Sequence, residues 1–466
     1  MNKIINNNKL LKELEEDIQI STSKIDEILA KAKELRGISH NEVLTLLKIE
    51  DKELLNCLYE TAKWIKQEIY GKRLVLFAPL YISNLCKNEC LYCAFRRANK
   101  KLIRKALSQE EIREEVEILL SQGHKRVLLV AGEAYTDEGL NYIFNSIESV
   151  YRVKTDKGNI RRLNVNIAPL SVEEFKELNK YSIGTYQLFQ ETYHEETYKK
   201  LHIGGPKTDY LYRLETMDRA LKAGLKDVGI GVLFGLYDWR YEILAILSHI
   251  NHLEENFGLG PHTISVPRLE PAFGSEISYK PPFPVCDEDF KKIIAVLRIA
   301  VPYTGIILST RENEQMRRDA FTLGISQISA GSRTNPGGYK HPDSETPEGM
   351  GSQFSLGDIR PLQDVIKDIV VHGYIPSFCT ACYRLGRVGK DFMDLAKPGL
   401  IKLHCLPNAM TTFAEYLEDF ADEELKKNGF NLIEKMIEKD VAKDETKNKI
   451  RKMIQEVKSG KRDMYI

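Results

Sequence analysis

Short apolar runs alternate with helical patterns through the middle of the chain. Eight such runs occur, at residues 73–83, 125–133, 163–168, 185–191, 227–235, 262–268, 305–312 and 325–332. The segments between them place apolar residues three and four positions apart, which is typical of amphipathic helices. Eight strands that alternate with helices predict parallel pairing through right-handed crossovers. Eight units within about 260 residues favour an α/β fold of the closed (β/α)8 barrel type over an open doubly wound sheet.

Helical patterns also dominate both ends of the chain. Residues 1–70 show helical spacing of apolar positions, and the last segments are rich in Lys and Glu at the same spacing. We therefore expect an N-terminal helical extension (1–70), the barrel (71–339) and a mostly helical C-terminal extension (340–466).

The charge balance narrows the class of partner. The 466 residues include 67 basic and 67 acidic side chains, which argues against a nucleic acid or an anionic membrane as the partner. No apolar run approaches the roughly 18 residues that span a bilayer, and the polar start lacks the apolar core of a signal peptide. We expect a cytoplasmic protein, where clustered cysteines indicate metal or redox chemistry.

Six of the eight cysteines form two clusters. Cys86, Cys90 and Cys93 have CxxxCxxC spacing, and Cys379 and Cys382 form a CxxC followed by Cys405 after 22 residues. Three thiolates on a four-iron cubane leave one iron open to a non-protein ligand, which indicates chemistry at the metal. A structural zinc site is the alternative, but it needs four ligands and the first cluster has no fourth Cys or His nearby.

The other two cysteines, Cys57 and Cys286, stand alone in the sequence. We expect both to be half-buried and structural, because isolated cysteines usually behave as small hydrophobic residues.

The first cluster follows the first predicted strand, and in this it resembles the radical S-adenosylmethionine (SAM) superfamily. Tyr92, the aromatic residue before the last cysteine, also fits that family. The resemblance implies a [4Fe–4S] cluster at Cys86, Cys90 and Cys93, with the amino and carboxylate groups of SAM on the fourth iron.

Four further residues resemble SAM-binding positions of the family. Gly132 and Glu133 end the second predicted strand and resemble the "GE" motif, whose backbone contacts the SAM amino group. Glu191 ends the fourth predicted strand, and Arg213 follows on the next helix. A carboxylate for ribose or ammonium and a guanidinium for a carboxylate suit SAM. Taken singly, Glu191 or Arg213 would more often form a surface salt bridge.

The second cluster narrows the resemblance to the HydG family of [FeFe]-hydrogenase maturases, which are tyrosine lyases. Other stretches resemble both this family and the ThiH tyrosine lyases of thiamine synthesis; they are residues 189–202, 265–272, 308–326 and 329–339. The ThiH family lacks the second cysteine set, so Cys379, Cys382 and Cys405 favour the HydG family.

The resemblance implies a reaction and its cofactors. Reductive cleavage of SAM gives a 5′-deoxyadenosyl radical, and the Cα–Cβ bond of L-tyrosine breaks to give p-cresol and dehydroglycine. Dehydroglycine becomes CO and cyanide at a second [4Fe–4S] cluster with an extra iron ([5Fe–4S]), which free L-cysteine also ligates. The iron–CO–CN–cysteine product serves hydrogenase active-site assembly. The implied transient partners are a maturation scaffold, companion maturases and an external electron donor.

Three residues near carboxyl ends of strands are candidates for binding the substrate. A buried tyrosine carboxylate needs a fixed cation, and Arg311, after the seventh predicted strand, is the first choice. Arg333 is the alternative. Ser329, near the end of the eighth strand, is a candidate acceptor for the amino group.

His262 begins the sixth predicted strand, so we expect it at the opposite mouth of the barrel. A lone histidine there is usually a hydrogen-bonded structural residue. The resemblance implies instead that it holds the extra iron, on the order of 20 Å from SAM.

Two other functions remain open from the sequence. One is a ThiH-like lyase that stops at dehydroglycine, with a structural or electron-relaying second cluster. The other is a non-catalytic iron–sulfur carrier, although a carrier does not need a pocket of eight strands. CO release and SAM cleavage distinguish them.

Overall fold

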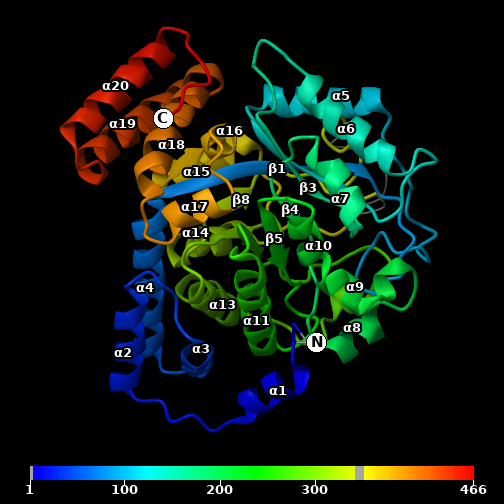
Figure 1. Cartoon of the computed structure of the whole chain (residues 1–466). Coiled ribbons are helices and arrows are strands. Elements are labelled where there is room, and N and C mark those ends of the chain that lie inside the picture. Colours follow the sequence, from blue (N-terminus) through cyan, green and yellow to red (C-terminus); the bar gives the residue numbers. More distant parts are fainter. Residues whose placement is uncertain (1–3, 342–350) are drawn as a thin grey trace.

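The computed structural model describes residues 4–341 and 351–466 and contains a closed parallel barrel (Figure 1). The barrel strands are β1 (Arg73–Ser83), β2 (Arg126–Ala131), β3 (Arg162–Asn166), β4 (Tyr186–Gln187), β5 (Val228–Gly231), β6 (Thr263–Ser265), β7 (Gly305–Leu308) and β8 (Gln327–Ser329). They pair in chain order, and β1 closes the barrel between β8 and β2. The predicted (β/α)8 barrel is confirmed, and the alternative, an open doubly wound sheet, does not occur among these strands.

Helices cover the outside of the barrel between strands. In chain order they are α5 (Gln109–Ser121), α6 (Leu140–Arg152), α7 (Val172–Asn179), α8 (Glu195–Leu201), α9 (Tyr210–Leu214), α10 (Thr216–Lys222), α11 (Trp239–Phe257), α12 (Glu276–Tyr279), α13 (Asp287–Ala300) and α14 (Glu314–Leu323). Their apolar faces bury against the strands, as in α5, where Ile112, Val116 and Leu119 are buried. Ser108 and Glu111 form the capping box that starts α5.

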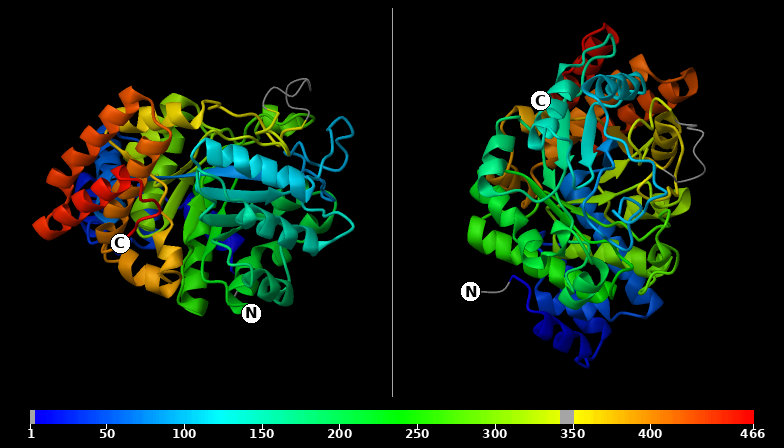
Figure 2. Two further views of the ribbon diagram at one scale, coloured as in Figure 1. Left: turned by 90° about the horizontal axis from the view of Figure 1, so that it is seen from above. Right: turned by 90° about the vertical axis from the view of Figure 1, so that its right-hand side faces the viewer.

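The N-terminal segment folds into four helices, α1 (Asn7–Glu15), α2 (Thr22–Ala32), α3 (His40–Leu47) and α4 (Lys52–Tyr70). The C-terminal segment contains α15 (Leu362–Val371), α16 (Ala381–Arg384), α17 (Lys390–Ala396), α18 (Lys402–Asp419), α19 (Glu423–Asp440) and α20 (Asp444–Lys458). In the described residues no helix combines the length and apolarity needed to cross a membrane. Figure 2 shows α19 and α20 at the end of the molecule opposite to the loop that follows β1.

A ninth strand, β9 (Ile375–Ser377), was not predicted and ties the C-terminal segment to the barrel. It pairs in parallel with the first residues of β1, so that Arg73 faces Ile375 and Val75 faces Ser377. Val75 also pairs with Gln327 of β8, so β8 and β9 occupy opposite edges of β1. Because the start of a parallel strand marks the bottom of a barrel, β9 brings the following cysteines to the bottom mouth.

The expectation for the two isolated cysteines was wrong, because both Cys57 and Cys286 are exposed. Cys57 lies on the outer face of α4, whose buried positions include Leu58, Ala62 and Ile65. Cys286 precedes α13, where its sulfur accepts a hydrogen bond from the backbone N–H of Asp289 at 3.4 Å. Its position as a helix cap explains the exposure.

Candidate active site

Two cavities lie at opposite ends of the barrel, and each contains predicted site residues. The top cavity is lined by Tyr92, Cys93, Glu191, Arg311 and Ser329, among others. The bottom cavity is lined by His262 and by all three cysteines of the second cluster. One strand contributes to both cavities through alternate residues on its inner face. Val75 of β1 lines the bottom cavity, and Phe77, Pro79 and Tyr81 line the top one.

The loop that carries Cys86, Cys90 and Cys93 leaves the top of β1. A second segment braces it through backbone hydrogen bonds, from Leu91 N–H to Leu201 O and from Ile203 N–H to Glu89 O, both 3.0 Å long. The loop is therefore held in place before any cluster binds.

Neither cysteine set converges as the ligands of a single ion. Among residues 4–341 and 351–466, no three His, Cys, Asp or Glu side chains form a mononuclear metal site. A cubane places its three thiolates on three different irons, so the sulfurs stand further apart than the ligands of one ion. The donor set of three thiols per site fits such a cluster.

Tyr92 is buried beside the cysteine loop and hydrogen-bonded to His202. Its hydroxyl lies 2.7 Å from His202 Nε2, while His202 Nδ1 lies 2.8 Å from the Tyr198 carbonyl. Because a carbonyl only accepts, Nδ1 carries the proton and Nε2 accepts from Tyr92. Burial holds the pKa of His202 well below its usual value, which keeps the ring neutral.

Four charged side chains form a network that reaches the top cavity through Glu191. Arg213 pairs with Glu133 at 2.8 Å and approaches Glu191 at 3.6 Å. Lys207 Nζ lies 2.7 Å from Glu191 Oε1. Although burial opposes the charged form, Arg213 and Lys207 hold the pKa of Glu133 below its usual value. Two carboxylates matched by two cations can receive both an ammonium and a carboxylate group.

The position of Glu191 differs slightly from the prediction. The regular part of β4 ends at Gln187, and Glu191 follows as a single bridge to Val232 with a φ of 72°. That left-handed backbone is costly for a non-glycine residue, and such strain is concentrated at functional sites.

Arg311 and Ser329 both line the top cavity, as expected. The Arg311 guanidinium lies over the Phe354 ring at 3.2 Å from its centroid, and no carboxylate of the described residues lies within 4.0 Å of it. Enclosure by the barrel lowers the pKa of Arg311. Ser329 Oγ accepts a hydrogen bond from Thr310 N–H at 3.1 Å.

Arg333, the alternative cation, does not line this cavity. It borders a separate surface cavity together with Arg360 and Tyr416, and one of its guanidinium nitrogens donates to the Ser332 carbonyl at 3.0 Å. The geometry therefore favours Arg311 as the cation that faces the barrel interior.

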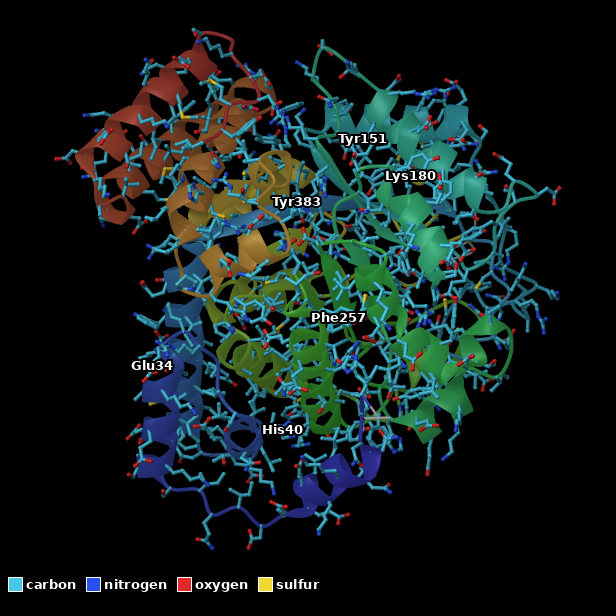
Figure 3. All side chains as sticks on the ribbon, viewed as in Figure 1. Glu34, His40, Tyr151, Lys180, Phe257 and Tyr383 are labelled. Atoms are coloured by element: carbon cyan, nitrogen blue, oxygen red, sulfur yellow. The ribbon has the colours of Figure 1, made fainter. Side chains whose placement is uncertain are left out.

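His262 lies at the bottom mouth between two polar groups. Its Nδ1 is 3.4 Å from Asp227 Oδ1, and its Nε2 is 3.4 Å from the Tyr383 hydroxyl. Gly389 N–H donates to the same Asp227 oxygen at 3.0 Å. Figure 3 labels Tyr383 on α16, beside the barrel strands. Asp227 therefore lies on the Nδ1 side of the ring, while Nε2 faces the Tyr383 hydroxyl in the cavity.

The cysteines of the second set come from three places in the C-terminal segment. Cys379 follows β9, Cys382 lies on α16 and Cys405 on α18. Arg73 and Arg126 also line their cavity, and Arg126 donates to the Cys379 carbonyl at 3.0 Å. Burial raises the pKa of the Cys379 thiol, and the two guanidinium groups oppose that rise because they favour the thiolate.

Comparisons with known proteins agree with this geometry. The Radical SAM superfamily model matches residues 80–247, and the Biotin and Thiamin Synthesis associated domain matches residues 265–375. A crystal structure of HydG, a maturase of the [FeFe]-hydrogenase, is 48% identical with a TM-score of 0.95, and the match covers 99% of this chain and 100% of that chain.

Two further relatives are similar over much of their length. HydG from Carboxydothermus hydrogenoformans is 41% identical with a TM-score of 0.82, covering 96% of this chain and 97% of that chain. The 2-iminoacetate synthase of Salmonella typhimurium is 31% identical over 73% of this chain and 86% of that protein. The chain is therefore an enzyme of the radical SAM tyrosine-lyase family that includes the HydG maturases and the 2-iminoacetate synthases.

Proposed function

We propose that the protein cleaves the Cα–Cβ bond of L-tyrosine to p-cresol and dehydroglycine, and then converts dehydroglycine to CO and cyanide. The product is an iron–CO–CN–cysteine precursor for the active site of [FeFe]-hydrogenase. The observation that carries this proposal is the pair of cysteine-lined cavities at opposite ends of one barrel, the second of them beside His262.

The family implies SAM and a [4Fe–4S] cluster, and the top of the barrel suits both. Cys86, Cys90 and Cys93 are the cluster ligands in this proposal, while the Glu133, Glu191 and Arg213 network receives the polar groups of SAM. When bound, cluster and SAM supply a 5′-deoxyadenosyl radical that removes a hydrogen atom from the substrate.

Arg311 and Ser329 bind tyrosine in this proposal. The planar guanidinium pairs with the carboxylate through two parallel hydrogen bonds. It is available for this role because no carboxylate of the described residues lies within 4.0 Å of it. Ser329 Oγ accepts from the amino group while it remains hydrogen-bonded to Thr310 N–H. The aromatic and aliphatic walls of the cavity, which include Phe354 and Ile307, exclude water from the reacting atoms.

The second half of the reaction belongs to the bottom cavity. Cys379, Cys382 and Cys405 would hold the second [4Fe–4S] cluster, and His262 together with free L-cysteine would hold the extra iron that the product carries. Asp227 Oδ1 lies 3.4 Å from Nδ1 of the His262 ring. From Val75 to Tyr81 the inner face of β1 spans roughly 20 Å, which is the distance that the small fragment travels inside the barrel.

A 2-iminoacetate synthase that stops at dehydroglycine is the second candidate function. The similarity to the Salmonella typhimurium enzyme favours it, but that similarity covers 73% of the chain, whereas the match to HydG covers 99%. Because the longer match includes the C-terminal segment, it supports a catalytic role for the second cysteine set in that segment. By the same analogy we propose a maturation scaffold and companion maturases as transient partners.

The experiment is an assay of both halves of the reaction. The anaerobically reconstituted protein is incubated with SAM, tyrosine, L-cysteine and dithionite; p-cresol is quantified and CO is trapped on deoxyhaemoglobin. Both products support the proposal. If p-cresol forms without CO at full iron loading, the protein has only the 2-iminoacetate synthase activity. If neither product forms, tyrosine is not the substrate.

A further inference from the structure

The loop beside the first cysteine cluster is strongly basic in an otherwise balanced chain. Between Cys93 and Leu107, six of the 13 residues are Lys or Arg and none is Asp or Glu. Lys87, between the first two cluster cysteines, adds a seventh cation. The chain as a whole has a formal net charge of zero, so this concentration is local.

Three of these cations have structural partners inside the protein. Arg96 pairs with Glu89 at 3.0 Å, and Lys105 pairs with Glu111 at 2.8 Å. Arg104 donates to the carbonyls of Asn84 and Phe95, each at 2.8 Å. These contacts account for their presence without a partner protein.

The other four cations have no such partners among residues 4–341 and 351–466, and we call them the basic collar: Lys87, Arg97, Lys100 and Lys101. All four are exposed, and within the residues that the structure describes none has a carboxylate closer than 4.0 Å. A local concentration of exposed cations attracts an acidic partner from solution.

The collar is rigidly attached to the cluster loop. Arg97 N–H donates to Asn88 O at 2.8 Å, and Arg96 N–H donates to Cys93 O at 3.2 Å. Buried Asn99 ties the same loop to the carbonyls of Ala94 and Phe273, each at 2.9 Å. A protein bound to the collar therefore rests directly against the segment that carries the cluster cysteines.

Two exposed apolar side chains lie on the same segments. Ile103 is 50% exposed within the basic loop, and Ile203 is 59% exposed where its backbone pairs with the cysteine loop. Apolar contacts beside charged ones are the usual composition of a specific protein interface.

We propose that the basic collar, with Ile103 and Ile203, is the docking surface for a small acidic iron–sulfur protein that reduces the first cluster. This inference rests on the proposed function, because SAM cleavage consumes one electron per event. The docked carrier is oxidised by one electron and the first cluster is reduced by one. Iron–sulfur proteins reach the low potentials that this transfer needs.

The test uses the reconstituted holoenzyme and a reduced acidic plant-type [2Fe–2S] ferredoxin as the probe. The variant R97E/K100E/K101E reverses three collar charges. The matched control K427E/K435E/K452E reverses three exposed lysines on α19 and α20, at the far end of the molecule (Figure 2). Calorimetry gives the Kd at low and at physiological salt, and stopped-flow absorbance gives the rate of cluster reduction.

We expect the collar variant to raise the Kd about tenfold or more at low salt, and the control to change it less than about twofold. The Kd of R97Q/K100Q/K101Q should lie between those of the collar variant and the control. This neutral variant replaces the charge-reversed one if the latter folds poorly. With dithionite as the reductant, all variants should form p-cresol at the unmodified rate. That arm separates this inference from the proposed function, whose failure would abolish p-cresol in every variant.

Three results overturn the proposal. One is an unchanged Kd and an unchanged reduction rate in both collar variants. Another is equal weakening by the control, which would indicate a nonspecific charge effect. The third is binding of an acidic flavoprotein or of RNA to the collar while the ferredoxin does not bind, because the partner would then have a different chemistry.

Discussion

At the scale of single residues, the proposed function assigns the tyrosine carboxylate to Arg311, which lines the top cavity. Lys in its place keeps the charge but loses the planar fork that matches a carboxylate. We predict that Arg311→Lys raises the tyrosine KM by about tenfold or more, equivalent to about 1.4 kcal/mol of binding free energy. SAM cleavage without tyrosine should persist. Steady-state p-cresol formation and 5′-deoxyadenosine release measure the two effects.

Arg333→Lys is the matched control, because Arg333 faces a different cavity. A tyrosine KM that rises in the Arg333 variant and stays constant in the Arg311 variant would reverse the assignment.

The buried carboxyl group of Glu242 should make the stability of the protein depend on pH. Burial raises the pKa of Glu242 from 4.5 to about 8, with Thr192 and the Tyr193 N–H as its hydrogen-bond partners. Between these two values the folded protein holds a proton that the unfolded chain has lost. The free energy of unfolding therefore falls as the pH rises through this window, by about 1.4 kcal/mol per pH unit.

Glu242→Gln removes that titration and keeps a neutral hydrogen-bonding group. We predict that the free energy of unfolding of the variant, relative to that of the unmodified protein, rises by about 2–3 kcal/mol when the pH is raised from 5.5 to 7.5. Thermal unfolding at the two pH values measures the difference as a shift in Tm. Glu445→Gln, at an exposed site on α20, is the control. A gain of the same size at both pH values would contradict a raised pKa.

Residues whose chemistry follows from motif spacing or from strand ends could be predicted from the sequence. Arg311 and Ser329 were placed at the top of the barrel and His262 at the bottom, and the structure agrees with these positions. Lys207 and Asp227 were missed. Each contacts a residue that is not adjacent to it in sequence, Glu191 or His262, and the fold brings the members of each pair within 4.0 Å.

At the scale of elements, the end of β2 and the start of the cysteine loop are in close contact. A Cβ on Gly132 would lie 2.2 Å from the Leu85 carbonyl oxygen, directly before Cys86. We predict that Gly132→Ala displaces the loop at a cost of about 1–3 kcal/mol and lowers the iron content of the first cluster. Iron analysis and EPR of the reduced protein measure the loss.

Gly351→Ala is the control, since its added Cβ would meet ordinary contacts at 3.5 Å. Full iron loading in the Gly132 variant would show that the loop adapts without cost.

The elements differ in how far the sequence predicts them. β1 was predicted with its observed bounds, because its 11 residues form a continuous buried run. β9 was missed because Ile375–Ser377 has three residues and includes Pro376, so neither length nor propensity distinguishes it. Its position depends on pairing with Arg73–Val75, about 300 residues earlier in the chain.

At the scale of the whole molecule, the barrel places two cysteine-lined cavities at its opposite ends. The first cysteine set follows the carboxyl end of β1, and β9 brings the second set to the amino ends of the strands. Because the two sites share no ligand, each can be removed while the other remains.

The variant C379S/C382S/C405S tests this independence. We predict that it loses CO formation and the iron of the second cluster, yet forms p-cresol within about twofold of the unmodified rate, because transition-state contacts to tyrosine lie in the top cavity. C57S/C286S, at the two exposed cysteines, should retain both products and all iron. If p-cresol disappears together with CO while the EPR signal of the first cluster persists, the bottom site controls the chemistry at the top, and the barrel acts as one coupled site.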